Sequence, residues 1–472
     1  MSEGSQLELN FGERRNRFKE DLENGRFALL FEVETPSRDC DLPTAAARLD
    51  PLLAAIEKIG PTKGGIAVVD KRSHLESYNV ADFASNLITK DRDRHLVFIS
   101  GKGGSPAEIE GTIAACANNG FPNIVAVTGD GAPATSRTAP AARHVDSVHI
   151  LAAAGRHKDK TIYQGCVVNP FKYVPLDVFP QYLKLVKKFN CGANFVVTQA
   201  GWDMLKLQEL RWYLEMRSLY HQSLARLMIL TPEAVTDILA DRRPGIRISP
   251  DFRSMLEKES KFSEVQFMAA QWRRIQLMVA GLKFLGYSGV VVAGAEKPQW
   301  VLTAASKIAE GLDEFQSFNE WRDAYRGHLS RAEMAPYPHR FYMFDNLLKV
   351  SHDEAPSMRE VASPVWSRGE RFRHTLARRL FKDATRKDPA HLRFLKKLLV
   401  NCVDCRSCRL ELTHFVCPET CPKKLANGPC GGSRANGDCE FGGTPCVHGV
   451  VFKIASEAKT IDSLEETVIP SA

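Results

Sequence analysis

The sequence predicts an α/β protein: a (β/α)8 barrel of the TIM type, followed by a helical connector and a small C-terminal Cys-rich metal-binding module. Short apolar runs alternate with amphipathic segments between residues 27 and 315, in the order and over the length expected for such a barrel. Beyond this region the alternation stops, and eight of the 12 cysteines gather between Cys402 and Cys446. A chain of 472 residues is long enough for a barrel and an added module.

The predicted strands are near-continuous apolar runs, which is typical of strands buried on both faces of a parallel sheet. They span residues 27–34, 65–70, 95–100, 124–128, 162–168, 195–199, 227–230 and 287–292. Amphipathic segments such as 106–119, 176–189 and 298–312 separate them. A doubly wound open sheet would give the same alternation, but the count of eight favours a closed barrel.

Composition divides the chain into five parts. We expect a polar lead-in (1–26), the barrel (27–315), a basic helical connector (316–395), the Cys-rich module (396–455) and a flexible tail (456–472). Residues 368–397 carry eleven Lys and Arg against three Asp and Glu. Such a run is either a solvated helical face or a docking surface for an acidic protein or an anionic ligand.

Bulk properties exclude several classes of protein. The N-terminus lacks the apolar core of a signal peptide, and the longest apolar runs are too short to span a membrane. Basic residues are not accompanied by an aromatic-rich nucleic-acid motif. We therefore expect a soluble cytoplasmic protein that binds neither nucleic acid nor membrane. In that compartment clustered cysteines indicate metal binding rather than disulfides.

The clustered cysteines follow a ligand-like spacing. They are Cys402, Cys405, Cys408, Cys417, Cys421, Cys430, Cys439 and Cys446. The first three resemble the three-ligand run of a [4Fe-4S] cluster, whereas the later ones could close a tetrahedral zinc site. Eight thiolates suffice for two four-ligand sites. Iron–sulfur, zinc or both remain open, and spacing does not assign the cysteines to sites.

In a (β/α)8 barrel, chemistry is found at the carboxyl ends of the strands. The first predicted strand ends with Glu32 and Glu34, whose side chains point in opposite directions, so that one faces the interior. A desolvated carboxyl suits general-acid work. The third strand is followed by a Gly-rich loop with Lys102, which could cradle a phosphate but lacks Walker spacing.

Five motifs, taken in order, resemble the methylenetetrahydrofolate reductase family over roughly residues 25–315. They are Phe-Glu-x-x-x-Pro at 31–36, His-Leu at 95–96, Gly-Asp at 129–130, Asn-Pro at 169–170, and Lys-x3-Gly-Ala-x4-Thr-Gln at 188–199. The resemblance implies a flavin, FAD or alternatively FMN, across the strand ends. It implies reduction of 5,10-methylenetetrahydrofolate to 5-methyltetrahydrofolate, or the reverse reaction.

The resemblance also implies residue roles. Glu32 would protonate the folate as general acid, and Asp130 would lie between flavin and pterin, as a catalytic and substrate-binding residue. Gln199 would bind the pterin. The cofactor-binding residues would be His95, Thr128, Gly129, Asp130, Asn169 and Lys188, the last of them pairing with the flavin phosphate. The chain departs from the family pattern at Glu34 and Thr128, and after Gln199, which leaves the flavin type and the electron donor open.

The segment 417–432, with Cys439 beyond it, resembles the Cys-rich domain found beside some bacterial methylenetetrahydrofolate reductases, a separate subunit in acetogens. This implies that electrons reach the flavin through a cluster. The expected partners are tetrahydrofolate C1 derivatives and an acidic electron-transfer protein or redox subunit. Whether the chain forms a homo-oligomer stays open. The alternative is a folate-dependent methyltransferase or demethylase component with a structural or thiol-activating zinc. A third hypothesis, a scaffold without turnover, is disfavoured by intact Glu32, Asp130 and Gln199.

Overall fold

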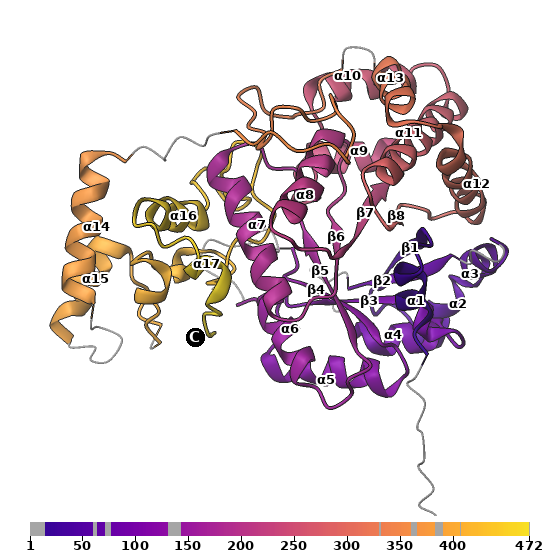
Figure 1. The fold of residues 1–472 in the computed structure, drawn as a ribbon. Helices are drawn as coiled ribbons and strands as arrows, with labels where there is room; N and C mark the ends of the chain where they lie inside the picture. The colour runs from indigo at the N-terminus through magenta and orange to yellow at the C-terminus, as the bar shows by residue number, and fades with distance from the viewer. Residues whose placement is uncertain are drawn as a thin grey trace, which may run out of the picture.

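A computed structural model describes residues 15–59, 64–70, 77–130, 143–329, 332–359, 366–382, 390–405 and 407–471. Eight parallel strands pair in chain order, and the last pairs with the first, so the sheet is a closed barrel (Figure 1). This confirms the predicted fold class. The strands are β1 (Ala28–Glu34), β2 (Gly65–Val69), β3 (Leu96–Ser100), β4 (Asn123–Val127), β5 (Tyr163–Val168), β6 (Phe195–Thr198), β7 (Gln222–Met228) and β8 (Gly289–Ala293).

Most strands lie within a residue or two of the predicted runs, but β7 does not. It begins at Gln222, five residues before the predicted start at Leu227. Its first five residues include Gln222, Ser223 and Arg226, which interrupt the apolar pattern used for the prediction. The barrel tolerates Arg226 because a carboxylate inside the barrel pairs with it.

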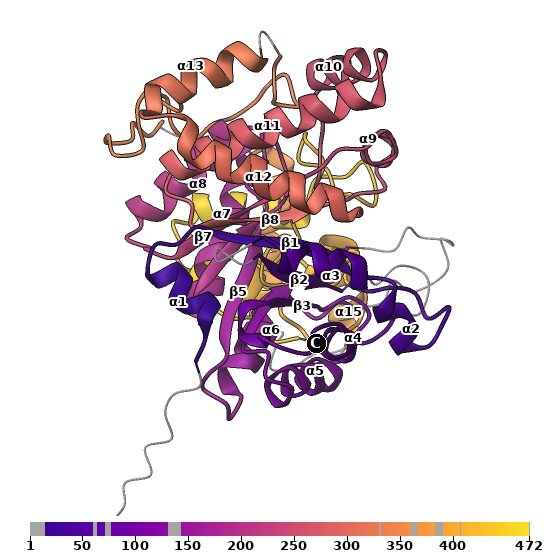
Figure 2. The ribbon, with the colours of Figure 1, turned by 90° about the vertical axis from the view of Figure 1, so that its right-hand side faces the viewer.

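Helices cover the outside of the barrel. They are α2 (Leu42–Ala47), α3 (Asp50–Glu57), α4 (Val80–Leu87), α5 (Pro106–Asn118), α6 (Ser147–Arg156), α7 (Pro175–Asn190), α8 (Met204–Met216), α9 (Pro232–Leu239), α10 (Pro250–Ser260), α11 (Glu264–Phe284) and α12 (Pro298–Glu314). The helix α12 packs against both α11 and α3, which closes the ring beside β8 and β1 (Figure 2). None of the helices in the described part of the chain is both long and apolar enough to cross a membrane.

The lead-in closes the amino-terminal end of the barrel. Helix α1 (Arg17–Glu23) buries Phe18 and Leu22 among the side chains that fill the barrel interior. The Phe18 ring meets Phe195 edge-on, with 5.3 Å between ring centroids. Ligands therefore have access at the opposite end, where the strands finish.

The connector is not a free linker. After α13 (Phe318–Leu329), an irregular stretch packs on the outer face of α8, where Tyr342 and Met343 are buried. The Met343 N–H donates to buried Glu209 Oε2 at 2.6 Å. The connector then leaves the barrel for the helices α14 (Arg368–Phe381) and α15 (Ala390–Val400), which pair with one another.

The Cys-rich module lies against α7 rather than apart from the barrel (Figure 1). Helices α16 (Val447–Glu457) and α17 (Ser463–Glu466) both contact α7, and Phe452 stacks on Phe179 at 5.3 Å between centroids. The segment expected to be a flexible tail packs here as well: Ile469 is buried, and its N–H donates to Asn427 Oδ1 at 2.7 Å. Its polar composition hid these contacts, which form only once the module is folded.

Buried lysines hold the module in place. Lys184 on α7 donates to the carbonyl oxygens of Gly428 and Pro429, both at 3.1 Å, and pairs with Asp146 at 2.9 Å. Lys172 donates to the backbone carbonyl of Ser433 at 2.9 Å. A buried ammonium without oxygen partners is costly, so these bonds strongly favour the docked arrangement.

The Lys184–Asp146 pair predicts an acid-sensitive component of stability. Burial alone would raise the pKa of Asp146, but Lys184 and His149 more than offset this and lower it to about 2. The pair is fully stabilising above the ordinary carboxyl pKa of 3.8, and the contribution is lost as pH falls through the folded value. The stability advantage of wild type over Asp146→Asn should therefore shrink by up to about 2 kcal/mol between pH 5 and pH 2.

Denaturant unfolding at several pH values measures this difference. Asp313→Asn, an exposed site near the end of α12, serves as the matched control and should show no such trend. An advantage over Asp146→Asn that stays constant across this pH range would contradict the assignment.

Candidate functional site

An ion-pair network crosses the carboxyl end of the barrel. Glu32 on β1 accepts two hydrogen bonds from Arg226 on β7, from Nε and Nη2, both at 2.6 Å. The remaining Arg226 Nη1 donates to Gln199 Oε1 at the end of β6, also at 2.6 Å. Bidentate guanidinium–carboxylate pairs are strong and directional, and this one leaves the Glu32 side chain only 6 % exposed. The network brings together two of the predicted site residues.

Arg226 is the member that sequence reasoning missed. The signal was an arginine inside a segment otherwise apolar on both sides, next to a predicted strand. A charge in a buried strand needs a partner of opposite charge. Glu32, at the end of the first strand, was the carboxylate available within the same barrel.

Asp130 joins this network by its charge. Burial alone would lower the pKa of Arg226, but neighbouring carboxylates outweigh it and raise the pKa. Glu32 contributes most, followed by Glu34 and Asp130. Although Asp130 is exposed at the mouth, desolvation by the surrounding protein raises its pKa, and the neighbouring Lys423 opposes that shift. Glu32, Gln199 and Asp130, the predicted catalytic and substrate-binding residues, therefore share one end of the barrel.

The turn before Asp130 requires glycine. Gly129 has a φ of +86°, and a Cβ there would lie 2.3 Å from Ser100 Oγ. Its carbonyl oxygen accepts a hydrogen bond from Lys423 Nζ at 3.0 Å. The Cys-rich module thus contacts the barrel within one residue of Asp130.

Three predicted flavin residues point elsewhere. His95 precedes β3 at the amino-terminal end of the barrel, where its Nδ1 accepts from the Ile66 N–H at 2.9 Å and burial lowers its pKa to about 4. Thr128 Oγ1 lies 3.2 Å from Ser147 Oγ, facing α6. Lys188 donates to the Val167 carbonyl at 2.5 Å.

Asn169 lies at the mouth but is already engaged. Its Nδ2 donates to the carbonyl oxygens of Gly245 at 2.9 Å and Gly431 at 2.7 Å. Gly245 has a φ of +77°, and a Cβ there would lie 2.8 Å from the Gly431 oxygen. Barrel strand, barrel loop and Cys-rich module converge at this point.

A cavity of about 720 Å³ opens beside Glu32 on the β1, β7 and β8 side of the mouth. Glu32 and Glu34 supply carboxylates to it, while Met228, Phe267 and Trp300 supply apolar walls. The lining is mixed, because it also includes the charged residues Glu233, Asp237, Arg243, Glu264, Glu296 and Lys297. The volume is in the range of small-molecule sites.

The expected flavin cradle is not assembled by the residues assigned to it. His95 lies at the far end of the barrel, while Thr128 and Lys188 contact the barrel's own wall. Gly129 and Asn169 contact the module. These side chains, as arranged, do not fit a flavin lying across β3 to β5. A ring system has room instead in the cavity beside Glu32.

The eight clustered cysteines fall into two groups of four. Cys402 and Cys408 pack with Cys417 in one apolar cluster. Burial is the main cause that raises the pKa of Cys417 to about 11. A backbone hydrogen bond opposes this shift, and the charges of Cys402 and Cys405 add to it. The pKa of each of the other four cysteines is likewise raised by the charge of another member of its group, although burial is the main cause in each case. These four are Cys421, Cys430, Cys439 and Cys446. This grouping could not be obtained from spacing.

Most of the cysteine sulfurs face a backbone N–H two residues later. Asp404 N donates to Cys402 Sγ and Gly432 N to Cys430 Sγ, both at 3.4 Å. The same i to i+2 arrangement recurs at Cys417, Cys421, Cys439 and Cys446. Hydrogen bonds of this kind favour thiolate over thiol, as metal ligation requires.

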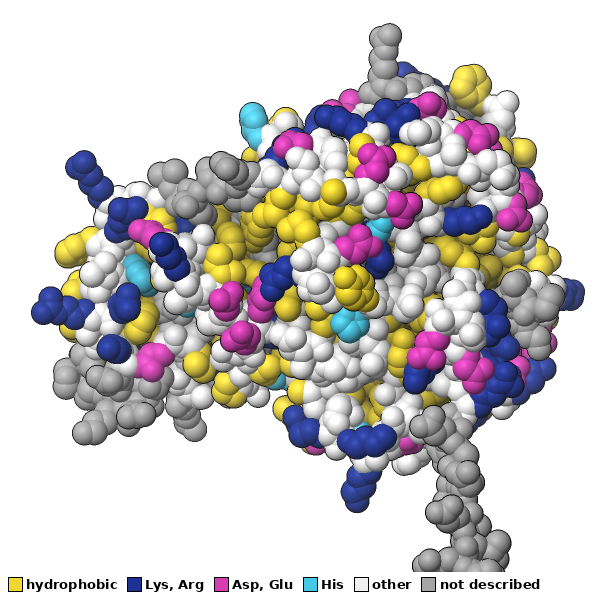
Figure 3. All heavy atoms as spheres, viewed as in Figure 1, with side chains coloured by type: hydrophobic (Ala, Val, Ile, Leu, Met, Phe, Trp, Pro, Cys, Tyr) yellow, Lys and Arg dark blue, Asp and Glu magenta, His cyan; other side chains and the backbone are white. Residues whose placement is uncertain are grey.

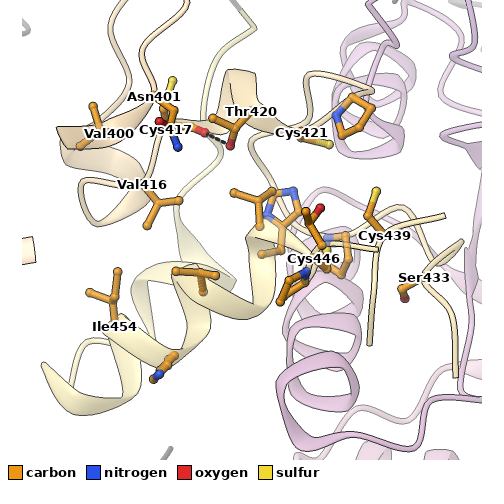
Figure 4. A pocket seen from close by; sticks show the side chains of 18 of the residues that line it. Val400, Asn401, Val416, Cys417, Thr420, Cys421, Ser433, Cys439, Cys446 and Ile454 are labelled. Atoms are coloured by element: carbon orange, nitrogen blue, oxygen red, sulfur yellow. Dashed lines mark hydrogen bonds between the residues drawn. The ribbon is translucent and has the colours of Figure 1, made fainter. Parts of the chain in front are cut away.

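A cavity of about 480 Å³ lies between the two groups. In the view of Figure 4, Cys421, Cys439 and Cys446 lie toward one end and Cys417 toward the other. Among the described residues, no three His, Cys, Asp or Glu side chains converge closely enough to hold a metal ion. The donor type and the N–H···S pattern nevertheless fit a metal, so metal binding stays a prediction.

Comparisons with known proteins bear on the module most directly. Residues 387–472 match the family model described as "Methylene-tetrahydrofolate reductase C terminal", which confirms the resemblance stated for this segment. A comparison with curated proteins found no match.

Among solved structures, one neighbour is an uncharacterized protein from Clostridium thermocellum that binds two copies of 5-methyl-5,6,7,8-tetrahydrofolic acid. It has 12 % identity, a TM-score of 0.45, and coverage of 62 % of this chain and 98 % of that one. Another is a proposed dihydrodipicolinate synthetase from Pseudomonas aeruginosa, with 10 % identity, a TM-score of 0.35, and coverage of 65 % and 81 %.

The network predicts a large penalty for removing Arg226 alone. Arg226→Met should leave the Glu32 carboxylate desolvated without a partner and lower the free energy of unfolding by about 3–5 kcal/mol. Adding Glu32→Gln to that variant should recover part of the loss, because the orphaned charge is then gone. Denaturant unfolding of the single and double variants measures the coupling.

Arg253→Met is the matched control, because its pair with Glu257 is exposed on both sides. That loss should stay below about 1 kcal/mol. Equal losses for the two arginine variants would refute the view that Arg226 holds a buried carboxylate.

Proposed function

We propose that this chain binds a one-carbon tetrahydrofolate at the barrel mouth and interconverts its 5,10-methylene and 5-methyl forms, as a flavin-dependent methylenetetrahydrofolate reductase. The observation that carries the proposal is the cluster of Glu32, Arg226, Gln199 and Asp130 at the strand ends. Three of these four occupy the motif positions on which the resemblance rests. The family match of the C-terminal segment supports the same reaction class.

Each residue has a distinct task in the proposed site. Gln199 offers an amide donor, and Asp130 offers a carboxyl, for the donor and acceptor edge of a pterin. Glu32 exchanges a proton with the folate ring nitrogen that is released when the five-membered ring opens. Because both Glu32 oxygens accept hydrogen bonds from Arg226, Glu32 can exchange a proton with the folate only when the pair separates.

A flavin, when bound, would supply the hydride. The residues first assigned to it do not form its cradle, so we place no step through it. The cavity beside Glu32 offers apolar walls from Met228, Phe267 and Trp300 against which the flavin ring system could pack.

The module would hold two metal centres, one for each cysteine group. Thiolate ligands select iron–sulfur clusters or zinc. With a [4Fe-4S] cluster the module would pass electrons toward the barrel, and with zinc alone it would hold the chain together.

Helices α14 and α15 would receive the electron donor. Dark-blue Lys and Arg side chains gather at this end of the molecule (Figure 3). Phe372 and Phe394 stand more than two-thirds exposed among them. The Cys402 N–H also donates to the Lys396 carbonyl, so α15 leads directly into the first cysteine group. A basic surface with apolar anchors beside a redox centre suits an acidic electron-transfer protein.

One observation favours a second candidate function. Within the described part of the chain, the residues assigned to the flavin do not form its cradle. A folate-dependent methyltransferase or demethylase component with a structural or thiol-activating zinc would therefore also use this mouth. The two functions differ in colour: the first requires a yellow protein, bleached by 5-methyltetrahydrofolate without oxygen, and the second a colourless one.

The reductase proposal predicts a selective effect of Glu32→Gln. Folate turnover should fall at least about 100-fold, the usual scale for a lost acid–base group. Reduction of the bound flavin by an artificial donor should be unchanged, because that step needs no folate proton. Stopped-flow absorbance measures both reactions.

Glu23→Gln, on α1 at the opposite end of the barrel, is the control and should turn over folate normally. Equal loss of both reactions in Glu32→Gln would show that Glu32 serves the fold or the flavin rather than the folate.

The cysteine grouping predicts separable metal losses. Cys417→Ser should empty the first centre and Cys446→Ser the second, so each should lose one centre's metal and the double variant both. Elemental analysis of anaerobically purified protein gives the content.

Cys40→Ser, outside the cluster, should keep all the metal. Loss of all metal from either single variant would contradict two independent centres and indicate one shared site.

A further inference from the structure

Lys423 belongs to the Cys-rich module but reaches into the barrel mouth. It lies two residues after Cys421, and its side chain is 3 % exposed. Its ammonium donates to the Gly129 carbonyl at 3.0 Å and pairs with Glu440 at 2.5 Å. The backbone is joined as well, because His144 N donates to the Lys423 carbonyl at 3.3 Å.

Glu440 ties this ammonium to the second cysteine group. It follows Cys439 directly, and its Oε1 lies 3.7 Å from Cys430 Sγ. The carboxylate sits against bare backbone, since a Cβ on Gly432 would lie 2.2 Å from Glu440 Oε2. The position of the pair therefore depends on how the loops carrying Cys430 and Cys439 are folded.

On the barrel side, the same ammonium holds the turn that presents Asp130. The Gly129 backbone is in the left-handed region, and its carbonyl is directed at Lys423 rather than at a neighbouring strand. If the ammonium is withdrawn, this carbonyl loses its charged donor, and the turn is free to re-orient.

We propose that Lys423 is a positioning residue of the barrel site, supplied by the Cys-rich module, and that it transmits the folded, metal-loaded state of the Cys421, Cys430, Cys439 and Cys446 group to Asp130. The inference rests on the proposed function, in which Asp130 contacts the folate. It gives the module a role at the substrate site that is independent of electron transfer.

Lys423→Met in the metal-loaded full chain tests the proposal. Calorimetry should show binding of 5-methyltetrahydrofolate weakened at least about 10-fold, the scale of one charge-assisted contact. Lys424→Met is the matched control: Lys424 donates to the Glu419 carbonyl within the module and should leave affinity and metal content unchanged. Equal weakening in both variants, or none in Lys423→Met, would overturn the proposal.

A double-mutant cycle separates positioning from general damage. If Lys423 acts through Asp130, Lys423→Met should cost little further affinity in an Asp130→Asn background. Fully additive losses would assign Lys423 a merely structural role and overturn the proposal.

Hydrogen–deuterium exchange of residues 123–130 provides a readout that needs neither folate nor a variant. Removal of metal from wild type should speed exchange at the end of this segment. If exchange responds while no folate binds, the coupling stands and the proposed function fails. If exchange does not respond, the coupling fails whatever the folate affinity.

Discussion

Buried ammonium groups from α7 and its neighbours must find oxygen partners, and the Cys-rich module provides them. Lys184 illustrates the constraint, with two module carbonyls and Asp146 around one nitrogen. Leaving such a cation unpaired in the interior would cost several kcal/mol, so the barrel and the module form one structure. The small apolar core of a loop-rich module could not secure that arrangement alone.

This docking makes the mouth of the barrel composite. Asn169 donates to the module at Gly431, and Gly129 accepts from Lys423. The β1, β7 and β8 side stays open beside Glu32. A substrate would thus meet catalytic groups from the barrel on one side and a wall shared with the module on the other. A requirement to form this wall would explain why the two parts occur in one chain.

Prediction from sequence succeeded where local pattern was sufficient. Apolar runs identified most of the strands. Glu32, Asp130 and Gln199, named from the motifs, lie at one end of the barrel, and their roles there are proposals. Arg226 was missed because its place in a buried strand makes sense only with Glu32 across the barrel. Lys423 was missed because its target lies almost 300 residues earlier, and no local pattern encodes that distance. The flavin positions were carried over from the family motifs, and motif spacing does not show that Asn169 and Gly129 contact the module.

A crystal structure of the metal-loaded chain with 5-methyltetrahydrofolate tests the central claim most directly. We expect the pterin at the strand ends, in contact with Gln199 and Asp130 and beside the Glu32–Arg226 pair. A folate bound away from these residues, or a mouth left empty at saturating folate, would contradict it.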